Sequence, residues 1–353
     1  MATRRRRTKA DEPAPEVEEA PVVVGEVVEE SPPEESPPEE VVEVALHEAA
    51  EKPEVEEDLP DFGEGSGAQL RLTLFRQGRR FLDFLELARQ KLSPLHVHQL
   101  RVSSRRLSST LSLFSSLVGK GPVKKLRRKL REVRRSLGVL RDLQRQLEWL
   151  VEEPLLDDYL TERAAELPSV IKRAGKQLKK IKASRLEKRL EMVDALLAGL
   201  LEDAQSEGDS REMLSRAIWE SLLQGMSHAD EVDPGNSFSY HPLRVAMKTF
   251  RYQAEVFASA GWTTRLAEHE GWEKVKALHE SLGMLQDLEV LACHLDFHWV
   301  QAPPIRDTQA RVLNRLLKER HQTLARIHLQ DLDWEQLWEW PQGEIEELLV
   351  EEV

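Results

Sequence analysis

The chain has 353 residues, of which 50 are Lys or Arg and 63 are Asp or Glu, so its net charge is −13. The single cysteine, Cys293, excludes an intramolecular disulfide and favours a reducing compartment. No apolar run approaches the roughly 20 residues needed to cross a bilayer, so we expect a cytoplasmic protein with no membrane association.

The charge is unevenly divided along the chain. Residues 1–67 hold 6 basic and 21 acidic side chains, and they are rich in Glu, Pro and Val, with the near-repeat ESPPEESPPEE. Large apolar residues are too few there to build a core, so we predict a disordered acidic tail. A solvated spacer is the favoured reading of this tail, and a segment that competes for a basic surface is the alternative.

The next part of the chain has the opposite character. Residues 68–150 carry 20 basic and only 5 acidic side chains. A local excess of that size attracts an anion. The sequence therefore indicates a polyanion-binding surface on the folded part of the protein.

After Gly67, apolar residues recur at three- and four-residue steps, which predicts an all-α fold. A first helix covers LRLTLFRQGRRFLDFLELARQKL, and Ser93 followed by Pro94 is typical of the start of the second. From there the predicted helices are 94–118, 122–151, 155–182, 184–206, 210–227, 240–260, 265–299 and 306–330. The chain ends in a Trp-rich, acidic segment, residues 333–353, which contains DWEQLWEW.

Two stretches of the chain repeat in the same order. Within LHVHQLRVSSRRLSSTLSLF (95–114), His98, Arg101 and Arg105 match His241, Arg244 and Lys248 of SYHPLRVAMKTFRYQAEVFA (239–258) at an offset of 143. SLGVLRDLQRQL (136–147) aligns with SLGMLQDLEVLA (281–292) at an offset of 145. Two matches at nearly one offset indicate duplicated halves. Each half is expected to form one helical bundle.

Helical geometry places the repeated polar residues on single faces, because positions i, i+3 and i+7 lie close together around a helix. His98, Arg101 and Arg105 share one stripe in the first half. The second half has the equivalent stripe in His241, Arg244, Lys248 and Arg251. Such a row of cations repels itself unless a counter-charge binds, and a bound anion would supply one.

The helix that follows the first stripe adds another basic face, formed by Arg127, Arg131, Arg134 and Arg141. Lys276 and His279 match Arg131 and Arg134 in the second half. Gly138 and Gly283 lie within strongly helical patterns, where glycine costs about 1 kcal/mol relative to alanine, so we expect another helix to pass close to them. A third basic stretch, residues 172–182, surrounds too much of its helix to be assigned to one site.

The motifs HxxRVxxRRL, HxxRVxxKxxRYxxE and the duplicated LGxLxDL resemble the CHAD domain, the conserved histidine α-helical domain, over about residues 70–330. The resemblance implies two pseudo-symmetric four-helix bundles that form a basic central cleft. With the tail and the C-terminal segment, the expected domains are 1–67, 68–206, 207–332 and 333–353. The resemblance also implies that the partner is inorganic polyphosphate, bound without catalysis or a cofactor, in association with polyphosphate granules.

Carried over residue by residue, the family's motif implies phosphate contacts in both halves. These contacts are made by His98, Arg101, Arg105, Arg106, His241, Arg244, Lys248, Arg251 and Tyr252, with Arg131, Arg134, Lys276 and His279 as second candidates. Ser108 stands where the family commonly has a further arginine, and Thr249 stands opposite Arg106. These departures make the two halves of the predicted cleft unequal.

Other functions are less well supported by the residues. A nucleic-acid-binding module is the main alternative, but few aromatic residues interleave with the basic stripes to stack bases. A scaffold that docks through the acidic tail and the Trp-rich segment is a third reading, with protein partners unknown. His96 with His98, and His294 with His298, suggest a metal site, but neither pair has a carboxylate or thiolate cluster beside it. Asp142 and Asp287 are expected to orient arginines rather than to catalyse a reaction.

Overall fold

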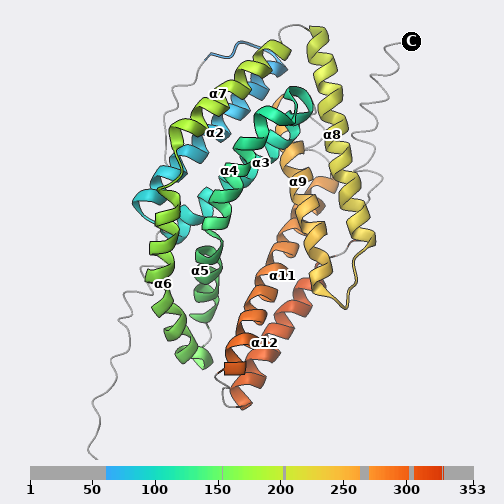
Figure 1. Cartoon of the computed structure of the whole chain (residues 1–353). Coiled ribbons are helices and arrows are strands. Elements are labelled where there is room, and N and C mark those ends of the chain that lie inside the picture. Colours follow the sequence, from blue (N-terminus) through green and yellow to red (C-terminus); the bar gives the residue numbers. More distant parts are fainter. Residues whose placement is uncertain are drawn as a thin grey trace, which may run out of the picture. The chain divides into compact units, whose positions relative to one another are not determined.

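The computed structural model describes residues 61–327, except 153, 202–203, 263–269 and 302–305, together with Leu329. This part of the chain is helical and contains no strand, which confirms the all-α prediction (Figure 1). The predicted acidic tail, up to residue 60, and the Trp-rich segment lie outside the described residues. None of the described helices has both the length and the apolar character needed to span a membrane.

The first half of the fold consists of six α-helices. They are α2 (Ser66–Gln90), α3 (Pro94–Val118), α4 (Lys120–Ser136), α5 (Gly138–Leu150), α6 (Asp157–Leu178) and α7 (Ala183–Leu200). A short 3-10 helix, η1 (Pro154–Leu156), precedes α6. The expected start of α3 is confirmed, because the Ser93 hydroxyl accepts a hydrogen bond from the His96 amide at 3.2 Å and Pro94 takes the first helical position.

The second half contains four described α-helices. They are α8 (Ala204–Asp230), α9 (Tyr240–Ser259), α11 (Glu270–Gln301) and α12 (Arg306–Leu324), and the 3-10 helix η2 (Ser237–Ser239) leads into α9. The breaks predicted from proline and glycine therefore separate the elements broadly as expected, although α6 and α7 end earlier than their predicted ranges.

One predicted helix is divided into two. We expected a single helix over residues 122–151, whereas Leu137, at φ −97° and ψ −5°, separates α4 from α5. The hydrogen bonds from Leu137 N to Val133 O (3.2 Å) and from Arg141 N to Leu137 O (3.0 Å) continue through this point. The division is thus a local distortion, which a hydrophobic repeat does not reveal.

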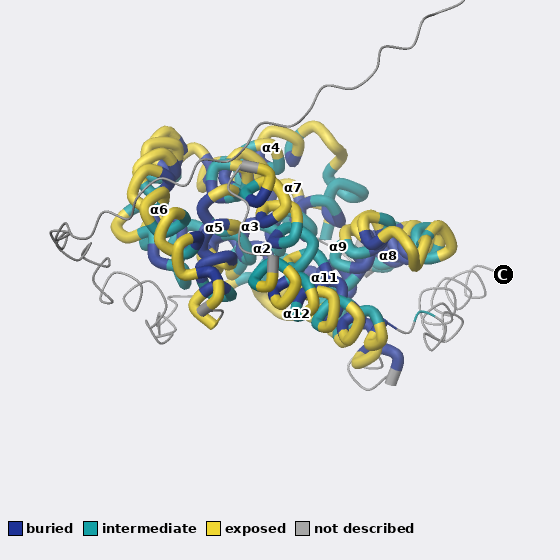
Figure 2. Tube along the Cα trace, turned by 90° about the horizontal axis from the view of Figure 1, so that it is seen from below, coloured by how far each residue is buried: buried dark blue, intermediate teal, exposed yellow. Residues whose placement is uncertain are grey.

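The two halves share one hydrophobic core. Helix α3 packs on α2 and α4 in its own half and on α8 and α9 of the other half, and α9 also contacts α2 and α11. The core contains Phe81 and Phe114 from the first half and Phe250 and Phe257 from the second, all at most 1% exposed. Figure 2 shows buried residues on the sides of the helices that face one another and exposed residues on the outer sides. Because the core is shared, α3 and α9 are held side by side.

A second, smaller core lies where α5 and α6 meet α11 and α12. It includes Leu150, Tyr159, Leu295 and Trp299. The two LGxLxDL segments come together nearby, since α5 contacts α11 and Arg145 Nη2 lies 3.1 Å from Asp287 Oδ2. The duplicated stretches of the sequence are therefore neighbours in the fold.

The prediction that Gly138 and Gly283 allow a close helix approach is wrong. A Cβ atom at Gly283 would meet nothing within 4 Å, and one at Gly138 would meet only the Arg101 Nη1 atom at 3.8 Å. Close approaches occur instead at Gly78, 2.9 Å from Leu190 Cδ1, and at Gly225, 2.8 Å from the Met247 sulfur. Helical periodicity showed that these glycines lie within helices, but it could not show which neighbours they face.

Candidate anion-binding site

Helix α3 places Arg101 and Arg105 on the face opposite its buried leucines. Leu100, Leu107 and Leu111 are completely buried in the core, which turns the arginines away from it. Arg101 Nη1 donates to the main-chain oxygen of Arg134 in α4 at 3.0 Å. Burial, followed by the charge of Arg105, lowers the pKa of Arg101 to about 10.

Helix α4 contributes Arg134 to the same region. Its Nη1 atom donates to the main-chain oxygen of Ser104 at 3.0 Å, so the side chain lies against α3. Burial and the charges of Arg105 and Arg131 lower the pKa of Arg134 to about 10. The carbonyl oxygens hold these guanidinium groups in place without neutralising them.

The second half contributes Arg244 and Lys248 from α9. Burial and the charge of Arg105 lower the pKa of Arg244. Burial, Arg105 and Arg244 together lower the pKa of Lys248 to about 7. The electrostatic influence of Arg105 on both residues shows that the predicted stripes of α3 and α9 meet in space. We call Arg101, Arg105, Arg134, Arg244 and Lys248 the cationic cluster.

The members of the cationic cluster form no ion pair with a carboxylate among the described residues. In this part of the chain none of its five members lies within 4.0 Å of a carboxylate oxygen, although Asp142 does raise the pKa of Arg101 from a greater distance. The Nε atom of Arg244 is buried and has no hydrogen-bond partner in the same part of the chain. Buried donors of this kind are costly unless a partner satisfies them, so the cluster is suited to an anion.

His279 of α11 lies beside the cluster and is neutral. Burial and the charges of Lys248 and Arg251 lower its pKa to about 3. Its Nε2 atom is buried without a hydrogen-bond partner among the described residues. As a neutral imidazole it can donate a hydrogen bond to an anion without adding to the repulsion between cations.

Tyr252 is covered by cations. Its ring is 5% exposed, and Arg106, Lys248 and Arg251 lie over it at 5.5, 6.0 and 5.1 Å from its centroid. Glu255 lies 3.7 Å from Arg106 and 3.6 Å from Arg251, so these two arginines are partly neutralised. The contact between Arg106 and Glu255 also joins the first half to the second.

The opposite edge of the cluster contains three residues of the first half, His98, Arg141 and Arg145. Burial and the charges of Arg141 and Arg145 lower the pKa of the exposed His98. Arg141 and Arg145 lie 3.2 and 3.1 Å from Glu148, and Arg145 also reaches Asp287. The last contact agrees with the expectation that this aspartate orients an arginine. Arg141 and Arg145 were not among the predicted site residues, although the three- and four-residue spacing from Arg127 pointed to Arg141.

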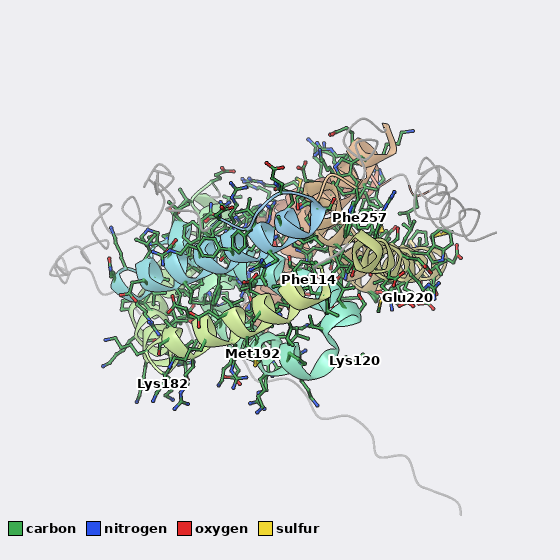
Figure 3. All side chains as sticks on the ribbon, turned by 90° about the horizontal axis from the view of Figure 1, so that it is seen from above. Phe114, Lys120, Lys182, Met192, Glu220 and Phe257 are labelled. Carbon is green, nitrogen blue, oxygen red and sulfur yellow. The ribbon has the colours of Figure 1, made fainter. Side chains whose placement is uncertain are left out.

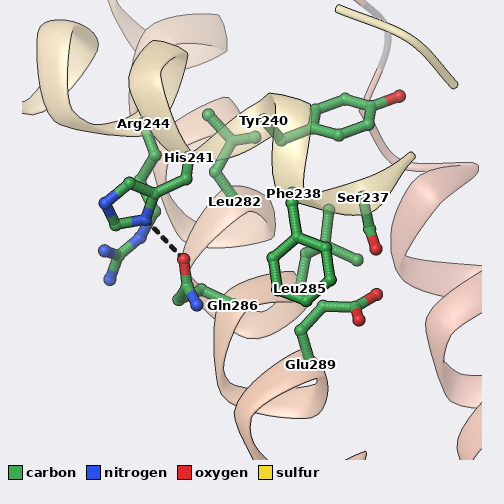
Figure 4. Close-up of a pocket in the computed structure, with 9 residues that line it drawn as sticks. All are labelled: Ser237, Phe238, Tyr240, His241, Arg244, Leu282, Leu285, Gln286 and Glu289. Atoms are coloured by element: carbon green, nitrogen blue, oxygen red, sulfur yellow. Dashed lines mark hydrogen bonds between the residues drawn. The ribbon is translucent and has the colours of Figure 1, made fainter. Parts of the chain in front are cut away.

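His241 faces α11 at the start of α9. Its Nδ1 atom lies 2.6 Å from the Gln286 side-chain oxygen, in a small pocket that Arg244 also lines (Figure 4). The two remaining candidates differ in their surroundings. Lys276 forms an ion pair with Glu273 at 2.7 Å and lies 6.0 Å from the Trp272 ring centroid. Arg131 is exposed, and its charge contributes to lowering the pKa of Arg134.

This arrangement offers fixed guanidinium groups, a lysine near its titration midpoint and a neutral imidazole. Guanidinium groups suit the oxygens of phosphate or carboxylate groups, which they contact through paired N–H donors. Within the described residues no group of three or more His, Cys, Asp or Glu side chains is arranged to hold a metal ion. The chemistry is that of an anion receptor.

A family model supplies an independent test of the fold. The model for the CHAD domain matches residues 73–296, which is more than half of the chain and includes the whole cationic cluster. The chain belongs to the CHAD domain family. The family is associated with polyphosphate binding, and the CHAD domain is generally a binding domain.

The solved structure of one CHAD domain supports the fold. The crystal structure of the CHAD domain from the plant Ricinus communis is similar, with a TM-score of 0.53 and 21% identity over 80% of this chain and 93% of that one. A second similar structure, PptA from Streptomyces chartreusis, has a TM-score of 0.42 and 16% identity over 81% of this chain and 99% of that one. No curated protein matches the sequence.

Proposed function

We propose that this CHAD domain binds inorganic polyphosphate through the cationic cluster and does not hydrolyse it. The observation that carries the proposal is the convergence of five cations from α3, α4 and α9 without a carboxylate at ion-pair distance in the described part of the chain. A flexible polymer with one charge on each unit can neutralise several cations at once. We further propose that the protein is associated with polyphosphate granules.

The surroundings of three cluster members suggest what each of them does. Arg101 and Arg134 are fixed by carbonyl oxygens, so they can hold phosphate oxygens with little loss of side-chain freedom. Arg105, whose charge lowers the pKa of most neighbours, supplies the centre of positive potential. We assign further phosphate contacts to His98, His241, His279, Arg106 and Arg251. Tyr252 lies under Arg106, Lys248 and Arg251 and so helps to position them.

Nucleic acid is the alternative polyanion, and the position of Tyr252 disfavours it. Single-strand binders usually stack bases on exposed aromatic rings. Tyr252, the aromatic residue beside the cluster, is buried and its ring is covered by Arg106, Lys248 and Arg251. The cluster thus offers charge and hydrogen-bond donors rather than a stacking surface.

A competition experiment tests the proposal. Full-length protein would be titrated with long-chain polyphosphate, single-stranded DNA and RNA at physiological salt. We expect polyphosphate to bind at least about tenfold more tightly than either nucleic acid. The double variant Arg105→Gln/Arg244→Gln should lose at least about tenfold in polyphosphate affinity, because each lost charged hydrogen bond is worth roughly 1.5–3 kcal/mol.

The matched control is Arg311→Gln/Lys318→Gln, which removes two exposed positive charges from α12. Equal losses in both variants, or equal affinity of the wild-type protein for all three polymers, would identify a generic basic surface and contradict the proposal. Thermal unfolding of each variant shows that it is folded. Release of orthophosphate from polyphosphate, assayed with and without divalent metal, would overturn the proposal that the protein does not hydrolyse its ligand.

A further inference from the structure

A second basic surface lies at the junction of α6 and α7. Residues 172–189 contain nine basic side chains and one acidic side chain, Glu187. Eight of the nine are exposed: Lys172, Arg173, Lys176, Lys179, Lys180, Lys182, Arg185 and Lys188. We call the nine basic side chains of residues 172–189 the basic hairpin. The cationic cluster does not include any of them.

Helix capping does not explain the basic hairpin. Lysines near the end of a helix often bind its last carbonyl oxygens. Here Arg89 of α2 performs this function, since its Nη2 atom donates to the main-chain oxygens of Leu178 and Ile181. Lys179, Lys180 and Lys182 are therefore available at the surface.

Ion pairing does not explain the basic hairpin either. No carboxylate oxygen among the described residues lies within 4.0 Å of its nitrogen atoms. Lys172 with Lys176, and Arg185 with Arg189, stand four residues apart in α6 and α7, where like charges destabilise a helix. Within the described part of the chain no carboxylate at ion-pair distance offsets this repulsion, and a bound anion would do so.

Helix α4 connects this surface to the cationic cluster. It packs on α3, which contributes Arg101 and Arg105, and also on α6 and α7. While Arg134 faces α3, the exposed residues Lys124, Lys125 and Arg135 lie on other sides of α4. Figure 3 shows Lys182, Met192 of α7 and Lys120 of α4 along one edge of the molecule. Helix α4 thus contacts the helices that carry both surfaces, and it has exposed basic side chains of its own.

We propose that the basic hairpin is a second anchoring surface for long polyphosphate, occupied by the part of the polymer that extends beyond the cationic cluster. The inference rests on the proposed function of the cluster. Linking two sites by one flexible polymer raises overall affinity without a new kind of contact, because the second binding event becomes intramolecular. We expect a polymer of only a few phosphates to occupy one surface at a time, so that the hairpin adds affinity for long chains alone.

The test compares two ligands and two triple variants of the full-length protein. The hairpin variant is Lys179→Gln/Lys180→Gln/Lys182→Gln, in the exposed turn after α6. The control is Arg311→Gln/Lys318→Gln/Arg326→Gln, which removes the same charge from exposed positions in and after α12. Binding of tripolyphosphate and of long-chain polyphosphate would be measured by calorimetry over a range of salt concentrations.

We expect the hairpin variant to bind long chains about tenfold more weakly while its affinity for tripolyphosphate is unchanged. The log–log salt slope for long chains should become shallower by about 2, which corresponds to roughly 0.7 for each of three lost contacts. The control should change neither value. Unchanged long-chain affinity in the hairpin variant, or an equal loss in the control, would overturn the inference. Failure of the wild-type protein to bind either ligand would overturn the proposed function and this inference with it.

Discussion

Arg101 and Arg134 fasten α3 and α4 to each other through reciprocal hydrogen bonds to main-chain oxygens. Arg101 Nη1 donates to Arg134 O, and Arg134 Nη1 donates to Ser104 O, both at 3.0 Å. Two like charges are thus brought together by neutral acceptors. The remaining N–H donors of both guanidinium groups can be used for a ligand, and their positions are set before it arrives.

Lys248 should make polyphosphate binding depend on pH. Its pKa of about 7 means that it is mostly charged at pH 6 and mostly neutral at pH 8, and a bound polyanion would favour the charged form. We expect affinity to fall by about tenfold from pH 6 to pH 8, because the charged fraction of Lys248 falls from about nine-tenths to about one-tenth. Titrations at both values of pH measure this ratio.

The comparison protein for this measurement is Lys248→Arg, which keeps its charge throughout the range. Its affinity should change much less between pH 6 and pH 8 than that of the wild-type protein. Protonation of the polymer itself affects both proteins alike. An identical pH dependence of the two proteins would show that Lys248 is not the titrating group.

Removal of the Lys248 charge should stabilise the protein when no ligand is bound. The folded state lowers the Lys248 pKa from 10.5, so between pH 10.5 and pH 7 the unfolded chain binds more protons and stability falls as pH falls. Lys248→Met should raise the free energy of unfolding at pH 7 by about 1–2 kcal/mol, because the partly exposed side chain retains some solvation. Denaturant titrations in phosphate-free buffer at pH 7 and pH 10 test this, and the gain should shrink at pH 10. A loss of stability at pH 7 would contradict the burial of a repelled charge.

Gly283→Ala should stabilise α11. The glycine lies inside the helix, and a Cβ atom there meets nothing within 4 Å, so the variant gains helix propensity without a clash. We expect an increase of up to about 1 kcal/mol in the free energy of unfolding. Gly225→Ala in α8 is the contrasting variant, because its Cβ would lie 2.8 Å from the Met247 sulfur. Equal gains in both variants would contradict the packing described for these glycines.

Much of the fold and part of the site could be predicted from the sequence. Helical periodicity located the elements, and the duplicated motif placed Arg101, Arg105, Arg244 and Lys248 on faces directed away from the core. The family match and the helical architecture confirm the predicted family and the all-α fold. The assignment of the individual phosphate-contacting residues remains a proposal.

What the sequence could not show is which faces meet across the two halves. Periodicity describes one helix at a time, so it did not reveal that Arg106 reaches Glu255 or that Tyr252 lies beneath three cations. It also did not show the distortion at Leu137, because the hydrogen bonds and the apolar pattern continue through it. These features depend on tertiary packing between segments far apart in the chain.

If the protein binds polyphosphate as proposed, the repulsion within the cationic cluster would couple the stability of the folded chain to the supply of this ligand. A ligand that binds only the folded state stabilises it by an amount that grows with the ratio of free ligand to Kd, about 2.7 kcal/mol at a hundredfold ratio. When polyphosphate is scarce, the folded chain bears the repulsion among Arg101, Arg105 and Lys248 alone, and it should unfold and be degraded more often. The steady-state level of the protein would then rise and fall with the cell's polymer reserve, without a dedicated regulator.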